Sequence, residues 1–449
     1  MIHSCVSTFF RSIASVVLGA APAAPLGSRR QHERCGSSLL LSLGFIAVMI
    51  SRTMFQNMNG VADESFKLKT QLTGIDSNPE ILNPLANSNS FNISNVSTST
   101  AIDWMGIQPR VWEPYPASRQ LCFNPDKLRV GRNSDNPFPV FSIPFNESFV
   151  AKRGILFLKP MKVGGSTASG INLRIAKNMA ERLGRDYPFC ENNFDHAMGF
   201  MMSGRNRSES FLWTLLRDPT KRAISGFYHF DVSRYGVEPS LENFKATLSN
   251  KTDFYLRLHY FGRFPSHGNE KQKVKSANEI MKKYDFMAIT ERFDESMVIL
   301  QMLLKAHNVT MGDLLYINAK SNNGYDDGGY KGKCTFIRQA ELTPEMKKFV
   351  STKEWREQIQ WDNAFYAAAN RSLDMTIDLL GRETVEQKVE LYRWAQSIVK
   401  DRCAGEARLK CTTSGVKRQP NETNCLFSDS GCAYECLDAF VADELMLAY

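Results

Sequence analysis

Three short apolar runs, each followed by a helical pattern, constrain the fold of this chain more than any other feature. The runs are "GILFLK" from residue 154, "FLWTLLR" from residue 211 and "DFMAIT" from residue 285. Each has the length of a buried strand and is bounded by turn residues. Strands that alternate with helices are typical of a parallel sheet with helices on both faces. The sequence therefore predicts an α/β fold, with ligands bound at the carboxyl ends of the strands.

The segments after the runs have the periodicity of helices. Pro219 suits the first turn of a helix that continues through "TKRAISGFYHF". In the other two segments apolar residues recur three or four apart and predict one buried face: Ile171, Ile175, Met179 and Leu183 after the first run, and Phe293, Met297, Leu300 and Leu304 after the third.

The first loop, "KPMKVGGSTAS", has the composition of an anion-binding turn. Gly164 and Gly165 allow a tight turn and a close approach of the backbone to a ligand. Ser166 and Thr167 open the following helix, whose free N–H groups and positive dipole end attract an anion. Lys162 adds a charge, but it precedes the glycines, whereas the nucleotide-triphosphatase loop places its lysine after them. A glycine turn capped by Ser166, with an exposed lysine, explains this loop equally well when it is taken alone.

The second loop, "LLRDPTKRAISGFYH", predicts another anion site. Arg217 follows a strand directly, and Ser225 lies about two helical turns further on. A guanidinium and a hydroxyl that converge can hold a phosphate; the alternative is that Arg217 pairs with Asp218 to fix the start of the helix. Two anion sites on neighbouring strand ends indicate a ligand with two separate phosphate groups. ATP has a single phosphate chain, whereas 3′-phosphoadenosine 5′-phosphosulfate (PAPS) has a 5′-phosphosulfate and a distinct 3′-phosphate.

Four segments in this order resemble the Golgi membrane-bound carbohydrate sulfotransferases. "FLKPMKVGGSTAS" is similar to the 5′-phosphosulfate loop of the galactose-3-O-sulfotransferase group, and "LLRDPTKRAISGFYH" to its 3′-phosphate motif. "ITERFDESMVILQMLL" and "WDNAFYAAANRS" resemble two further segments of that group, and the uronyl 2-O-sulfotransferases have a related arrangement. The resemblance covers roughly residues 150 to 380. Pro160-Met161 departs from the Thr-His that is common before the second lysine, and the Cys-rich tail has no counterpart.

The resemblance implies a set of donor-binding residues and a P-loop-like parallel sheet. The 5′-phosphosulfate would be bound by Lys162, Gly164, Gly165, Ser166 and Thr167, and the 3′-phosphate by Arg217 and Ser225. Lys162 would also act catalytically, by stabilising the charge that develops on the leaving phosphate oxygen, and we expect no metal.

The acceptor hydroxyl needs a base, and the resemblance points to His196. This residue stands where the uronyl 2-O group carries its catalytic histidine, and an imidazole titrates near neutral pH. A hydrogen-bonded histidine near the sheet edge is the structural alternative. Other candidates for the base are His229, His259, Glu191 and Asp195.

The N-terminal region predicts a membrane anchor. Residues 36–51 carry no charge, and residues 53–55 extend this segment past Arg52 toward the length of a membrane span. Arg29, Arg30 and Arg34 precede it, so the positive-inside rule places residues 1–35 in the cytoplasm. A cleaved signal peptide or a buried core helix are the alternatives. We expect an anchor at 36–55, a stem rich in Asn, Ser and Thr at 56–110, a catalytic domain at 111–400 and a Cys-rich tail at 401–449.

Cysteines and glycosylation motifs favour the lumen of the secretory pathway. Eight of the ten cysteines follow the anchor, and five of them lie between residues 403 and 436. This clustering predicts a disulfide-bonded module, with zinc as the alternative. N-x-[ST] motifs occur only after the anchor, at Asn92, Asn95, Asn146, Asn206, Asn250, Asn308, Asn370 and Asn421.

The sequence thus leads us to expect a single-pass type II Golgi enzyme that uses PAPS. It would transfer a sulfonate to a glycan hydroxyl, such as the 3-hydroxyl of galactose or of a related sugar on a glycolipid, glycoprotein or polysaccharide. The alternatives are a uronyl or hexose 2-O-sulfotransferase, a luminal ATP-dependent kinase and a non-catalytic glycan-binding protein. The net charge of +8 suits an anionic ligand but decides nothing alone, and we expect no nucleic-acid partner.

Overall fold

The structure of the chain is a computed structural model, and it describes residues 105–121, 153–182, 192–195, 202, 204–255, 261–265, 268–318, 324–326 and 333–444. The predicted anchor at 36–55, and His196, His259 and Glu191, lie outside these residues. Within the described part of the chain, no helix has the length and apolar character needed to cross a membrane.

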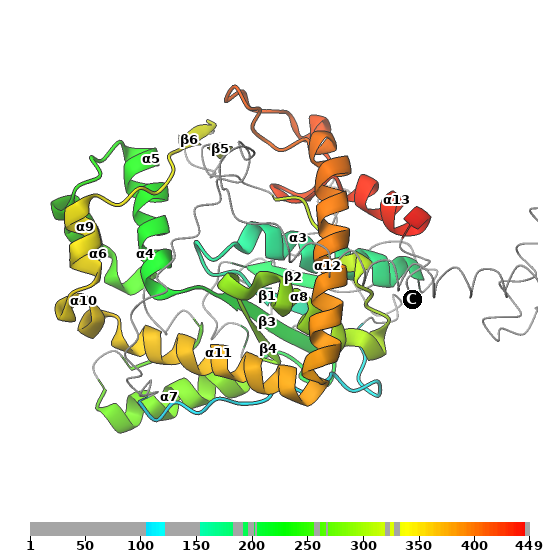
Figure 1. Cartoon of the computed structure of the whole chain (residues 1–449), viewed down its shortest axis with the longest axis horizontal. Coiled ribbons are helices and arrows are strands. Elements are labelled where there is room, and N and C mark those ends of the chain that lie inside the picture. Colours follow the sequence, from blue (N-terminus) through cyan, green and yellow to red (C-terminus); the bar gives the residue numbers. More distant parts are fainter. Residues whose placement is uncertain are drawn as a thin grey trace, which may run out of the picture. The chain divides into compact units, whose positions relative to one another are not determined.

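A parallel sheet of four strands forms the centre of the fold (Figure 1). The strands are β1 (Gly154–Leu158), β2 (Asn192–Asp195), β3 (Ser210–Leu216) and β4 (Phe286–Ile289). Their order is β2-β1-β3-β4, and each neighbouring pair is parallel. The three predicted strands and the α/β class are confirmed. The edge strand β2 was not predicted.

The helices either pack on this sheet or form a group beside it (Figure 1). They are α3 (Gly165–Arg182), α4 (Pro219–Gly226), α5 (Ser233–Tyr235), α6 (Leu241–Tyr255), α7 (Glu270–Lys283), α8 (Phe293–Leu304), α9 (Pro344–Val350), α10 (Lys353–Gln358), α11 (Gln360–Leu380), α12 (Arg382–Cys403) and α13 (Tyr434–Glu444). Two antiparallel strand pairs lie outside the main sheet: β5 (Gly324–Asp326) with β6 (Thr335–Ile337), and β7 (Cys425–Phe427) with β8 (Ser430–Cys432).

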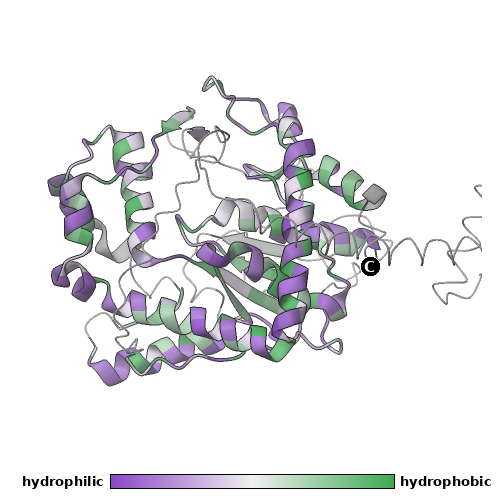
Figure 2. Ribbon diagram, in the orientation of Figure 1, coloured by the Kyte–Doolittle hydropathy of each residue, from purple (hydrophilic) through white to green (hydrophobic). Residues whose placement is uncertain are grey.

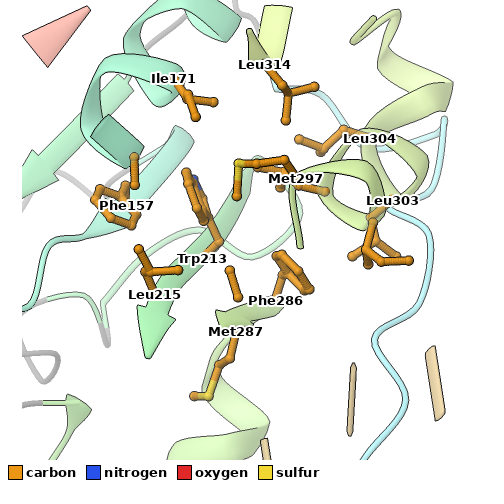
Figure 3. Close-up of a cluster of buried hydrophobic side chains, with 14 of the residues drawn as sticks. Phe157, Ile171, Trp213, Leu215, Phe286, Met287, Met297, Leu303, Leu304 and Leu314 are labelled. Atoms are coloured by element: carbon orange, nitrogen blue, oxygen red, sulfur yellow. The ribbon is translucent and has the colours of Figure 1, made fainter. Parts of the chain in front are cut away.

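The main core lies between the sheet and the helices packed on it (Figure 3). All residues of β1, β3 and β4 are buried, which is expected of parallel strands covered on both faces. The rings of Phe157 and Trp213 lie 4.4 Å apart, and the Trp213 indole N–H donates to Asn172 of α3 at 2.8 Å. Asn172 in turn donates to the carbonyl of Ile155 in β1 at 3.2 Å, so α3 is fixed to two strands. Hydrophobic residues concentrate on the strands, whereas α7 and α10 are largely hydrophilic (Figure 2).

The helix starting at Pro219 has a different course from the one predicted. The Asp218 side chain caps it by accepting from the backbone N–H of Lys221 at 2.8 Å. The α-helix ends at Gly226, and Phe227–Val232 continue it as a π-helix, a form that is rare and often found at functional sites. Beside it lies a second core, in which Phe244 packs between Phe227 and Trp355.

The predicted core positions in the other two helices are buried, except that Phe293 is only partly so and Leu183 lies outside the described residues. The packed part of the chain also starts earlier than predicted. Ile107 is buried in the main core, and the backbone N–H of Arg110 donates to Ser372 of α11 at 2.9 Å. Residues 105–110 therefore belong to the folded part, whereas the predicted stem extended to residue 110.

All five cysteines of the tail form disulfides, so the zinc interpretation is wrong and the disulfide interpretation is confirmed. The pairs are Cys334–Cys411, Cys403–Cys436 and Cys425–Cys432. The tail is not a self-contained module, however, because Cys411 pairs with Cys334, far outside it. Cys403 is also the last residue of α12, so one disulfide fixes α13 to this long helix.

Candidate functional site

The loop after β1 has the backbone of an anion-binding turn. Lys162 and Gly164 both have positive φ angles, +64° and +85°. This conformation is unstrained for glycine but costs energy for lysine, which is typical of functional loops. Helix α3 begins at Gly165, and its first hydrogen bond runs from the N–H of Ala168 to the carbonyl of Gly164 at 3.2 Å. The first N–H groups of α3 have no acceptor within the helix and are oriented toward this loop.

Arg217 joins this loop to the next one. It follows β3 directly, and its guanidinium donates from Nη1 to the carbonyl of Lys162 at 3.0 Å. Burial lowers the pKa of Arg217 from its ordinary value, while Glu291 and Asp218 raise it, and an arginine stays charged at neutral pH in any case. The two cationic loops predicted from the sequence therefore meet at one edge of the sheet.

Arg222 makes a second connection between the same two loops. It lies one turn into α4, is 5% exposed, and donates from Nε to the carbonyl of Met161 at 3.1 Å. A second buried guanidinium therefore faces the lysine loop. Arg222 was not among the predicted site residues, although its position one turn after Pro219 was a usable signal, because helical side chains point back toward the N-terminus.

The loop after β4 and helix α11 complete the arrangement. The Thr290 hydroxyl oxygen lies 2.8 Å from the carbonyl oxygens of both Val163 and Leu216, so it bridges the first two loops. The Glu291 carboxylate accepts from the backbone N–H of Asp218 at 3.2 Å and from the Tyr366 hydroxyl at 2.9 Å. All four segments that resemble the sulfotransferase group thus contact one another in a continuous network.

Tyr366 is held as a neutral donor to Glu291. Burial raises the pKa of its hydroxyl far above the usual value, and the nearby Glu291 carboxylate raises it further. The tyrosine therefore keeps its proton, and it connects α11 to the turn that carries Arg217.

A pocket lies where these segments meet. Its volume is about 340 Å³ including the open mouth. Two arginines, three aromatic side chains and a carboxylate are among its lining residues, which are Val163, Leu216, Arg217, Pro219, Arg222, Phe261, Asp362, Phe365 and Tyr366. Guanidinium groups suit a phosphate, and aromatic rings beside a carboxylate suit a heterocyclic base with an exocyclic amine.

The remaining predicted residues have different positions. Ser225 lies in the last turn of α4 and is half-buried. It is six residues beyond Pro219, or ~9 Å along the helix axis, so its convergence with Arg217 on one ligand stays a prediction. Thr167 lies in the first turn of α3 and is half-buried. Ser166, its neighbour, donates from its hydroxyl to the Asp429 carboxylate at 3.2 Å.

Among the candidate bases, His229 is the one whose side-chain contacts the structure describes. It lies in the π-helix Phe227–Val232 and is buried. The Arg234 guanidinium lies 2.9 Å from its Nε2, and the Asp326 carboxylate 3.4 Å from the same nitrogen. Because both contacts are to Nε2, this nitrogen already has partners within the protein, and this favours a structural role for His229. Asp195 ends the edge strand β2. The assignment of the base to His196 stays a prediction.

No family model and no curated protein matches the chain. Among the described residues, no group of three or more His, Cys, Asp or Glu side chains is placed to hold a metal ion. The described site brings together cationic and hydrogen-bonding groups of the kind that bind an anionic ligand.

Proposed function

We propose that this protein is a PAPS-dependent sulfotransferase that acts on a hydroxyl of a glycan. The contact that carries the proposal is the hydrogen bond from the Arg217 guanidinium to the Lys162 carbonyl. It brings the two expected anion sites within the reach of one nucleotide, as a ligand with two separate phosphates requires. ATP, with a single phosphate chain, does not need two such sites.

Several described residues are of the kinds that bind such a donor. The α3 N-terminus and Lys162 would hold the 5′-phosphosulfate, and Arg217 would hold the 3′-phosphate. The pocket beside Arg217 is lined by Phe365 and Tyr366, aromatic side chains of the kind that stack on an adenine ring. The mixture of two guanidinium groups and aromatic rings supports a nucleotide over a simple inorganic anion.

Sulfonate transfer requires one bond to form and one to break. The acceptor oxygen bonds to sulfur while the bond from sulfur to the 5′-phosphate oxygen breaks, and the acceptor proton passes to a base. Negative charge develops on the leaving oxygen. The ammonium group of Lys162 and the free N–H groups of α3 would stabilise that charge. His196 stays our candidate for the base.

Thermal unfolding of the folded fragment with different nucleotides tests this proposal. Saturating adenosine 3′,5′-bisphosphate, at ~100 times its dissociation constant, should stabilise the protein by ~2.7 kcal/mol. ATP at the same concentration should stabilise it much less. Stabilisation by ATP alone would support a kinase, and the absence of any nucleotide effect would support a non-catalytic glycan-binding protein.

The acceptor and the compartment are parts of the same proposal. We infer a terminal galactose or related sugar as the acceptor, with a uronyl or hexose 2-hydroxyl as the alternative. The three disulfides support an oxidising compartment, and this agrees with a type II Golgi protein anchored by residues 36–55. A glycan array with radiolabelled donor would identify the sugar.

A further inference from the structure

The Cys-rich tail reaches the candidate donor site through the β7–β8 hairpin. The Cys425–Cys432 disulfide closes this hairpin, and Ser428 and Asp429 form its turn. Ser428 has a positive φ of +52°, so the turn is held in a conformation that costs energy for a residue other than glycine. Asp429 therefore lies in a turn whose two strands are joined by a disulfide.

The hairpin is packed against α3 without free space. A Cβ atom added at Gly170 would lie 2.3 Å from the backbone nitrogen of Gly431. The hydroxyl oxygens of Ser169 and Ser430 lie 2.7 Å apart in the buried contact. Further along the tail, Asp438 of α13 forms an ion pair with the buried Arg174 of α3 at 2.6 Å. Backbone contact and a hydrogen bond thus fix the hairpin on α3, and charge fixes α13 beside it.

This packing brings a carboxylate to the start of α3. The Asp429 carboxylate accepts from the hydroxyl of Ser166, the second residue of the helix, at 3.2 Å and from the hydroxyl of its neighbour Ser430 at 3.4 Å, and Asp429 is partly exposed. A carboxylate complements the positive end of a helix dipole, and this structural role explains the contact alone. However, the same helix end is the candidate site for the phosphosulfate, and a fixed negative charge there opposes an anionic donor. A second ligand, one that donates hydrogen bonds to a carboxylate, would give this charge a further role beside the structural one.

We propose that the β7–β8 hairpin forms the acceptor side of the site, and that the Asp429 carboxylate binds hydroxyl groups of the acceptor glycan. This inference rests on the proposed function. Arg217 contacts the loop at Lys162, before the glycines, whereas Asp429 contacts it at Ser166, after them. A nucleotide held by Arg217 and the loop would place its sulfonate end toward Ser166. A sugar hydroxyl bound by Asp429 would then lie beside the transferred group.

Substitution of Asp429 by Asn tests the assignment, because it removes the charge and keeps the size. N-acetyllactosamine and a desulfated chondroitin oligosaccharide serve as acceptor probes, and the better acceptor of the wild type is used. We expect the KM for this acceptor to rise about 10-fold or more, which corresponds to the loss of a hydrogen bond to a charged group. The affinity for adenosine 3′,5′-bisphosphate should stay the same or increase, because a repulsive charge has been removed.

A loss of acceptor affinity without a loss of bisphosphate affinity separates acceptor binding from a purely structural role. If Asp429 only stabilises the hairpin, D429N should weaken bisphosphate binding together with acceptor binding, and this result would overturn the inference. An unchanged KM would do the same, as would a wild type that binds neither probe. Glu435→Gln, an exposed change on α13, is the matched control and should alter neither constant.

Two further measurements keep the test interpretable. Asp429→Glu retains the carboxylate, so it should recover part of the acceptor affinity that D429N loses; no recovery counts against the inference. The melting temperatures of all variants show whether each is folded. If adenosine 3′,5′-bisphosphate fails to stabilise even the wild type, the proposed function itself is wrong and the acceptor assignment falls with it. A wild type that binds the bisphosphate, beside a D429N variant with normal KM, contradicts the acceptor assignment alone.

Discussion

At the scale of single residues, Arg217 is expected to bind two different groups in the candidate site at once. Its guanidinium donates to the backbone of the lysine loop and is also expected to hold a phosphate. A planar group with five donors can do both, whereas the ammonium group of a lysine is a compact point charge. Charge alone is therefore insufficient at this position.

We predict that Arg217→Lys weakens the binding of adenosine 3′,5′-bisphosphate by roughly 10- to 100-fold, the range expected for losing a charged hydrogen bond. Isothermal titration calorimetry measures the change. Arg207→Lys is the control. Arg207 is exposed and lies before the first residue of β3, at the end of the strand away from Arg217. Its side-chain hydrogen bond in the described structure is to the carbonyl of Lys282. Equal affinities in the two variants would count against a phosphate contact by Arg217.

At the scale of elements, the contact between α3 and the β7–β8 hairpin determines whether the tail stays docked. Gly170→Ala adds a methyl group that would lie 2.3 Å from the nitrogen and 2.9 Å from the Cα of Gly431. Backbone atoms cannot turn away as a flexible side chain can, so the hairpin must shift. We predict a net loss of about 1 to 3 kcal/mol in the free energy of unfolding, even though alanine is the better helix former. Denaturant unfolding measures this loss.

Gly405→Ala is the matched control for this prediction. Gly405 lies in the 3-10 turn Ala404–Glu406, and a Cβ atom there meets nothing within 4 Å. Its substitution should change stability by no more than ~0.5 kcal/mol. If the two variants are equally stable, α3 and the hairpin are not in close contact in solution.

The elements also show which parts of the structure the sequence could predict. β1, β3 and β4 were predictable because each is a continuous apolar run, which a strand buried on both faces requires. β2 has the sequence "NNFD", with one large apolar residue, so it carries no such signal. The π-helical continuation at Phe227 likewise has no pattern distinct from an α-helix in the sequence.

The same reasoning applies to the candidate site. The meeting of Lys162 and Arg217 was predictable because both follow parallel strands, whose carboxyl ends lie at one edge of a sheet. The contact between Ser166 and Asp429 joins residues 263 positions apart, and no local pattern encodes it. The odd number of cysteines in the tail was a usable sign that at least one could pair outside it, as Cys411 does.

At the scale of the whole folded part, the disulfides connect segments that are distant in sequence. Cys334 and Cys411 are 77 residues apart, and their bond restricts the unfolded chain over that loop. We predict that replacing both by serine lowers the free energy of unfolding by about 2 to 4 kcal/mol. Denaturant unfolding without reductant measures the change.

The Cys425–Cys432 pair offers a comparison for this prediction. It closes a separation of only 7 residues, so its replacement by serine should cost less on the basis of loop entropy. An equal or larger loss of stability would mean that native contacts of the hairpin, and not restriction of the unfolded chain, dominate the effect.

The docking of the hairpin on α3 also has a consequence for biosynthesis. A ribosome completes the β1 loop and α3 long before it reaches Asp429, and domains begin to fold as they emerge. Ser430 and Gly431 cover part of the surface of α3 in the folded protein. This surface therefore stays uncovered while more than half of the described protein is still being made. The Cys403–Cys436 and Cys425–Cys432 disulfides can form only after these late residues are made, and a nascent chain released before residue 425 would carry the lysine loop without its partner.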